Sequence, residues 1–150
     1  MSLSQHLAHL YSARPMPTQL GDLGLLITRL FFGLSMALAH GINKVPASEK
    51  WIAKVESLGF IFPEVFAWSA GLSELIGGIL IAAGLITRGA AFSLFVTMCV
   101  AAFIAHGGDP YSKMELGLCY GAVSLMLVTL GPGRYSLDQL ISARRGSSYI

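Results

Sequence analysis

The sequence predicts an all-α fold: an antiparallel four-helix transmembrane bundle with a short amphipathic interfacial helix in its first outward loop. Four long apolar stretches carry this prediction, over Leu23–Ala39, Val65–Ile86, Ala90–Ala105 and Leu116–Leu130. At about 1.5 Å per residue, each is long enough, or nearly so, to cross a hydrocarbon core of about 30 Å. Only 12% of the 150 residues are charged, against about 25% in soluble domains, so they cannot cover a surface facing water.

The chain is expected to divide into an N-terminal arm (1–22), a transmembrane domain (23–133) and a C-terminal tail (134–150). The arm has no apolar run before a small-residue cleavage site, so we expect the first span itself to direct insertion. That span is predicted to begin after Asp22, which can cap its first turn. It is predicted to end at Gly41, which suits a left-handed C-terminal position.

The loop Ile42–Pro63 contains a predicted short helix over Glu49–Leu58. Trp51, Val55 and Leu58 fall on one face of this helix, and its charges lie elsewhere. The pattern favours a helix along the membrane surface with Trp51 at the depth of the lipid headgroups. A lid folded over the mouth of the bundle is the alternative.

The later spans are joined by short connections. The tight turn Thr87–Gly89 makes the second and third spans antiparallel neighbours, and Gly131-Pro132-Gly133 stops the fourth. Four spans place both termini on one side, and the positive-inside rule makes that side the cytoplasm of a bacterial inner membrane. The basic residues counted are Arg14, Arg88, Arg134, Arg144 and Arg145 on the terminal side, and Lys44, Lys50, Lys54 and Lys113 on the outer side.

Small residues four positions apart recur in the spans, where they permit close helix approach. We expect them to serve packing within the bundle, with a dimer contact as the alternative. The pairs are Gly117 and Gly121, Ser73 and Gly77, and Ala37 and Gly41.

Other chemistry is largely excluded by the sequence. Cys99 and Cys119 lie in apolar stretches without metal-ligand spacing and are expected to be small apolar core residues, unless the third and fourth helices bring both thiols face to face. The formal net charge of +2 is too small and too scattered to indicate a nucleic-acid partner. The sequence contains no phosphate-binding glycine loop, HExxH or catalytic triad pattern.

Two charges lie within the spans and are the main candidates for a site. Arg29 lies about two turns into the first span, and Glu74 lies in the middle third of the second. A charge at such depth costs several kcal/mol, about 2.5–3.5 at the low end, so each must face the interior and find a partner. We expect these residues to pair with each other, either to fix helix packing or to bind a polar headgroup, a quinone carbonyl or a proton. Snorkelling of Arg29 towards the interface is the remaining alternative.

A second polar cluster is predicted at the outward ends of the helices, formed by His40, Lys44, His106 and Glu115, with Asp109 beside them. These residues can cap helix ends, or can pass protons to Glu74. No metal is expected, because ligands such as His40, His106 and Glu115 come from separate helices without diagnostic spacing.

Three motifs, read in order, resemble the DoxX family. Arg29, Gly33, His40-Gly41 and Lys44 resemble its opening motif, and Glu74-Leu-Ile-Gly77-Gly78 with Gly84-Leu-Ile-Thr-Arg88 resembles its second. The ending Gly131-Pro-Gly-Arg-Tyr-Ser-Leu-Asp138 is similar to its C-terminal signature. The resemblance implies a small four-helix protein of the bacterial cytoplasmic membrane. It also implies Arg29, Lys44 and Glu74 as site positions, since they match recurring polar positions of the family.

The resemblance extends to relatives of DoxD, which are associated with thiosulfate:quinone oxidoreductase. We therefore expect a redox-associated membrane subunit that binds a quinone-like or other amphiphilic ligand, holds no covalently bound cofactor and relies on a redox protein partner within the lipid bilayer. A non-catalytic scaffold or assembly factor and a small proton-coupled transporter are the alternatives. No self-contained catalytic motif is present, so whether the chain is an enzyme stays open.

Overall fold

The computed structural model describes residues 18–146, which are almost entirely helical. No strand occurs within this part of the chain, so the predicted all-α fold is confirmed. Four helical segments are long and apolar enough to cross a membrane, and they match the four predicted spans: Gln19–Asn43, Pro63–Ala83, Thr87–Ala105 and Tyr111–Leu130.

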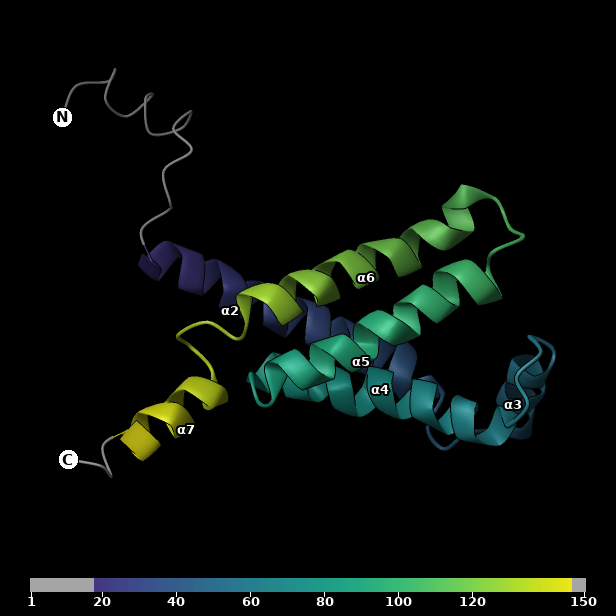
Figure 1. The fold of residues 1–150 in the computed structure, drawn as a ribbon, viewed down its shortest axis with the longest axis horizontal. Helices are drawn as coiled ribbons and strands as arrows, with labels where there is room; N and C mark the ends of the chain where they lie inside the picture. Colours follow the sequence, from purple (N-terminus) through teal and green to yellow (C-terminus); the bar gives the residue numbers. More distant parts are fainter. Residues whose placement is uncertain (1–17, 147–150) are drawn as a thin grey trace, which may run out of the picture.

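The spanning helices pack in the order of the sequence (Figure 1). Helix α2 (Thr18–Ser35) packs on α4 (Pro63–Ala83), α4 on α5 (Thr87–Val100), and α5 on α6 (Tyr111–Leu130). The ring of Tyr120 on α6 reaches α2, with its centroid 5.4 Å from that of Phe32. The core lies between these helices and includes Phe32, Met36, Ile81, Leu94, Met98 and Leu127.

Glycines on α2 and α4 allow the closest helix contact. A Cβ at Gly33 would lie 2.4 Å from the carbonyl oxygen of Gly78, and a Cβ at Gly78 would lie 2.6 Å from that of Gly33. On α6, Gly117 and Gly121 face Ala102 and Met98 of the preceding span. The small residues of α6 therefore serve packing within the bundle.

The first span ends differently from the prediction. After α2 the chain continues as a π-helical segment, Met36–His40, and a 3-10 turn, Gly41–Asn43. Gly41 has a φ of −64°, so the predicted left-handed cap is wrong. A Cβ at Gly41 would lie 2.4 Å from the backbone nitrogen of Leu75, so close approach to α4 explains this glycine.

Helix α3 (Glu49–Glu56) begins at Ser48, whose hydroxyl accepts a hydrogen bond from the backbone N–H of Trp51. It packs against α4: Val55 is buried, and the Trp51 indole N–H donates to the Ala67 carbonyl over 3.1 Å. Helix α3 is therefore folded against α4, a position that both alternatives for this segment allow.

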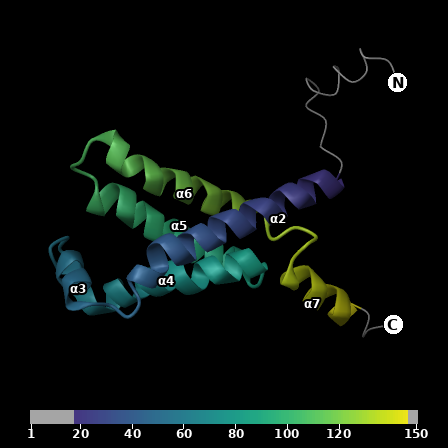
Figure 2. The ribbon, with the colours of Figure 1, turned by 180° about the vertical axis from the view of Figure 1, so that it is seen from behind.

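The turn after α4 and the C-terminal segment also differ from expectation. The chain reverses at Gly84, whose φ of +70° places it in the left-handed region that favours glycine, and α5 already begins at Thr87. The tail contains a further helix, α7 (Leu137–Gly146), that the sequence analysis did not anticipate. The beginning of α2 and α7 lie at the same end of the molecule, as an even number of spans requires (Figure 2).

Candidate functional site

A cavity of about 470 Å³ lies between α3, α4 and α5. Its walls are mainly apolar and include four aromatic side chains, and two of these, Phe60 and Phe66, have ring centroids 4.6 Å apart. The polar residues that line it are Lys44, Ser69, Glu74, Ser93 and Thr97. The cavity therefore combines a large apolar surface with a few polar groups, as ligand sites do.

The ion pair of the cavity joins Lys44 and Glu74, whose Nζ and Oε1 atoms are 2.7 Å apart. The Glu74 side chain is 3% exposed and that of Lys44 26% exposed. The Lys44 ammonium also lies 4.8 Å from the ring centroid of Trp51, in a cation–π contact. Trp51 brings helix α3 into the same site.

Two glycines allow the backbone segments that carry Lys44 and Glu74 to approach each other closely. Gly41 lies directly against the backbone of Glu74 and Leu75. Gly71 lies against Lys44, where a Cβ would be 3.0 Å from the Lys44 carbonyl oxygen. Because neither glycine has a side chain, Lys44 can lie beside Glu74, the acidic residue in the middle of α4.

A hydroxyl cluster lies next to the ion pair and links α4 to α5. The hydroxyl oxygens of Ser73 and Ser93 are 3.0 Å apart, and the Thr97 hydroxyl is 3.1 Å from that of Ser73 and 3.0 Å from the Ser93 carbonyl. Ser93 and Thr97 stand four positions apart in an apolar helix, and this spacing is the sequence signal that could have identified them. Trp51 was expected only as a membrane anchor.

One atom of the ion pair has no partner. The Oε2 atom of Glu74 is buried and accepts no hydrogen bond from any residue between 18 and 146. A buried carboxylate oxygen without a donor is costly, so this atom marks a position where a ligand can contribute one.

Arg29 does not pair with Glu74, and the predicted pair is wrong. The guanidinium is fully buried, and it donates to the carbonyl of Ile81 over 3.5 Å and to that of Tyr135. Helix register explains the difference, because Ile81 lies seven residues from Glu74, roughly 10 Å further along α4. Arg29 is therefore part of a second polar centre at the α7 end of the bundle.

That second centre fastens the C-terminal signature to the α4–α5 turn. Asp138 Oδ1 accepts from the backbone N–H of Ile86 over 2.7 Å, and Oδ2 accepts from the backbone N–H and the hydroxyl of Thr87, each over 3.0 Å. The Asp138 N–H donates to the Gly84 carbonyl over 2.9 Å. Asp138 thus caps the start of α5 from a distant part of the chain.

Asp22 adds a further tie at this end. It lies inside α2 rather than at its cap, and its Oδ1 accepts from the backbone N–H of Arg134 over 3.0 Å. The arm residues before Thr18 lie outside the described part of the chain. The contacts of Arg29, Asp22 and Asp138 give this centre a structural role in holding the C-terminal segment.

The Asp138 carboxylate makes this docking dependent on pH. Burial alone would raise its pKa, but the backbone N–H groups of Thr87 and Ile86, the Thr87 hydroxyl and the Arg29 charge together lower the pKa below its ordinary value. A lowered pKa in the folded state means that Asp138 contributes stability above its unfolded pKa of about 3.9, and that this contribution is lost as pH falls through the folded value.

We therefore expect Asp138→Asn to lower the free energy of unfolding by about 1–2 kcal/mol at neutral pH, because one amide oxygen replaces two charged acceptors. The gap between the melting temperatures of the wild type and the variant should narrow below about pH 4. Thermal melts in detergent between pH 7 and pH 3 measure this. If the two melting temperatures differed by the same amount at pH 7 and at pH 3, the charged Asp138 carboxylate would not be the source of this stability.

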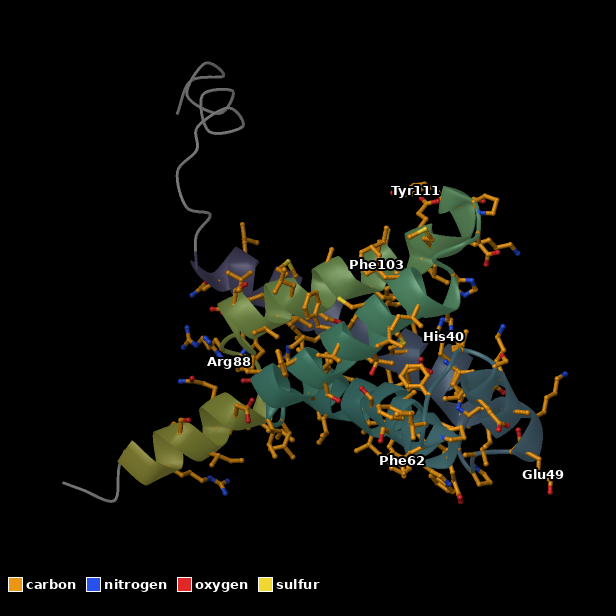
Figure 3. The ribbon with its side chains drawn as sticks, turned by 45° about the vertical axis from the view of Figure 1, so that its right-hand side comes forward. His40, Glu49, Phe62, Arg88, Phe103 and Tyr111 are labelled. Carbon is orange, nitrogen blue, oxygen red and sulfur yellow. The ribbon has the colours of Figure 1, made fainter. Side chains whose placement is uncertain are left out.

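The predicted outward cluster is not brought together. Lys44 pairs with Glu74, and His106 Nδ1 lies 2.8 Å from Asp109 within its own loop. The His40 ring contacts Tyr120 edge-on, with centroids 5.6 Å apart, and Glu115 is exposed. His40 does lie at the end of the bundle opposite Arg88, as expected (Figure 3). Separate local partners hold these side chains, so only Lys44 joins the cavity.

The candidate metal ligands and the two cysteines lie apart from the cavity lining. No group of three His, Cys, Asp or Glu side chains between 18 and 146 is placed to hold a metal ion. Cys99 and Cys119 are free thiols, and Cys119 is exposed on α6 rather than in the core.

The fold and the cavity together define a small four-span membrane protein with a charged pair in an apolar pocket. The profile of the DoxX family matches residues 24–107, more than half of the chain, and the chain belongs to this family. The matched region contains the ion pair and the hydroxyl cluster, whereas Asp138 lies beyond it.

The similar curated proteins are uncharacterized. One from Haemophilus influenzae is 32% identical, with 78% of this chain and 82% of the relative aligned. An uncharacterized membrane protein of Mycobacterium tuberculosis is 29% identical, with 83% of this chain and 85% of the relative aligned. No solved structure shows significant similarity.

Proposed function

We propose that this protein binds an uncharged, quinone-like amphiphile, with the polar head at Lys44 and Glu74 and the apolar part along the α4 and α5 walls. The observation that carries the proposal is a buried ion pair inside an apolar cavity of about 470 Å³. Arg29, which the sequence suggested for the same site, is engaged elsewhere and takes no part.

The charges of the site favour a neutral head. Lys44 and Glu74 balance each other, so an added anion would be repelled by the carboxylate and an added cation by the ammonium. The ammonium has three N–H donors, and one of them is used by Glu74 Oε1. The others suit a carbonyl oxygen such as that of a quinone.

The walls favour a planar ring and an apolar tail. Trp51, Phe60, Phe66 and Phe92 line the cavity, and aromatic faces stack on a flat head group. Phe66 and Phe92 are 44% and 58% exposed, so the cavity opens on the outer surface of α4 and α5. A tail can leave there into the surrounding lipid.

The wider role follows from the same proposal. The chain would act as a redox-associated subunit in the bacterial cytoplasmic membrane, with the electron-carrying cofactor on a partner protein. Arg88 lies at the α7 end (Figure 3), and the backbone of Arg134 bonds to Asp22 at that end, which supports a cytoplasmic position for it.

Trp51 offers a direct test of binding. The protein contains two tryptophans, Trp51 in the cavity and Trp68 outside its lining. In the Trp68→Phe variant, reconstituted in lipid nanodiscs, decylubiquinone is expected to quench the remaining fluorescence in a saturable manner, because the ring would lie beside Trp51.

Trp51→Phe, which retains Trp68, is the matched control. Its fluorescence should fall only in the linear, non-saturable way that a quinone dissolved in the bilayer produces. Saturable quenching that is equal in both variants, or absent from both, would contradict a quinone-like ligand in this cavity and favour the scaffold alternative.

A further inference from the structure

We infer that the cavity selects amphiphiles whose head carries a hydroxyl group, such as a quinol, a phenol or an alcohol, over heads that only accept hydrogen bonds. This inference rests on the proposed function and specifies its ligand class. It is carried by the buried, unpartnered Oε2 atom of Glu74.

Only one of the two carboxylate oxygens of Glu74 has a hydrogen-bond partner among the residues that the structure describes. Its Oε1 atom bonds to Lys44 over 2.7 Å, whereas Oε2 has no donor from the described chain. Glu74 lines the cavity although its side chain is only 3% exposed. A carboxylate accepts hydrogen bonds and donates none, so a donor for this atom has to come from outside the described residues, and we assign it to the contents of the cavity that Glu74 lines.

None of the described neighbouring donor groups bonds to Glu74 Oε2. The Trp51 indole N–H donates to the Ala67 carbonyl. The hydroxyls of Ser73, Ser93 and Thr97 bond with one another and with the Ser93 carbonyl. The one further hydroxyl of the cavity lining is that of Ser69, which donates to the Val65 carbonyl over 2.7 Å.

A hydroxyl group satisfies both members of the ion pair at once. Its hydrogen can be donated to Glu74 Oε2, while its oxygen accepts from the N–H groups of Lys44 that Oε1 does not use. A carbonyl or ether oxygen can only accept from Lys44 and leaves Oε2 unpaired. Discrimination of this kind is strong, because a polar group of the site is left buried without a partner by the wrong ligand.

A pair of probes that differ only in this hydrogen tests the inference. 4-Nonylphenol and its methyl ether, 4-nonylanisole, share the same ring and tail. Each is titrated against decylubiquinone bound to the Trp68→Phe protein in nanodiscs, and displacement is read as recovery of Trp51 fluorescence. We expect the phenol to displace the quinone at a concentration about ten- to a hundredfold lower than the ether, the range that a hydrogen bond to a charged acceptor implies.

The Glu74→Gln variant identifies the acceptor. Its amide can present N–H groups where the carboxylate oxygen was, so the preference for the phenol should fall to about threefold or less. Glu64→Gln, a change of an exposed acid in the first turn of the same helix, is the matched control and should retain the full preference.

The outcomes separate the two proposals. Equal displacement by phenol and ether would overturn the hydroxyl preference and leave the amphiphile site standing. Full preference in the Glu74→Gln variant would also overturn it, because another acceptor would be responsible. Absence of saturable quenching by decylubiquinone would defeat the proposed function, and the inference with it. The comparison of phenol and ether in the Trp68→Phe protein remains decisive even where the Glu74→Gln protein does not fold.

Discussion

Lys44→Met is expected to lower the free energy of unfolding by about 3–5 kcal/mol, because it removes the partner of a buried charge. Glu74 is then left with both oxygens unpaired in an apolar cavity. The 2.7 Å contact and the 3% exposure of the Glu74 side chain make the loss large. Unfolding in mixed detergent micelles, followed by tryptophan fluorescence, measures the change.

The double variant Lys44→Met with Glu74→Met is the control for this prediction. It removes both charges together, so most of the lost stability should return, as it does when apolar groups replace a whole buried pair. Quinone binding should not return, because the head group would have no polar partner. A double variant as unstable as the single one would show that Lys44 acts through packing and not through Glu74.

Gly78→Ala is expected to disrupt the contact between α2 and α4. The added Cβ would lie 2.6 Å from the Gly33 carbonyl oxygen and 2.9 Å from the Ala37 backbone nitrogen, and backbone atoms cannot turn away as side chains can. The helices must separate, at a cost of about 1–3 kcal/mol by comparison with other overpacked cores, which is about five- to a hundred-and-fiftyfold in the unfolding equilibrium. Thermal melting in detergent measures it.

Gly77→Ala is the matched control on the same helix. Its Cβ would meet only the Ala90 carbonyl at 3.7 Å, an ordinary contact, and alanine favours a helix over glycine by about 1 kcal/mol. Gly77→Ala should therefore be neutral or slightly stabilising. Equal melting temperatures for the two variants would contradict the close crossing at Gly33 and Gly78.

The fold was predictable because hydrophobic length determines it. Four apolar stretches of nearly membrane length leave few alternatives to four spanning helices, and each appears where expected within a few residues. Helix ends were less predictable. Gly41 carries the sequence signal of a left-handed cap but serves close packing, and an isolated glycine does not distinguish these two uses.

The sequence predicted which charged residues are buried, but not which residues they pair with. Depth in the membrane identified Arg29 and Glu74 as buried charges, and both are buried. Their partners depend on how far α2 is displaced along α4. In the structure Arg29 lies beside Ile81, about two helical turns from Glu74, and Lys44 is the partner of Glu74 instead. Tertiary contacts also decide the role of Asp138, since a polar tail gives no local sign that it caps a helix some fifty residues earlier.

The buried guanidinium has a consequence for biogenesis. Its carbonyl acceptor on Tyr135 lies 106 positions further along the chain, so the ribosome delivers it long after the first span has entered the translocon. Until then Arg29 lacks that acceptor. A nascent chain that stops before Tyr135 would therefore have a buried guanidinium with too few hydrogen-bond acceptors in its first span. A truncated product would thereby differ chemically from a finished one, and membrane proteases that recognise exposed polar groups could distinguish the two.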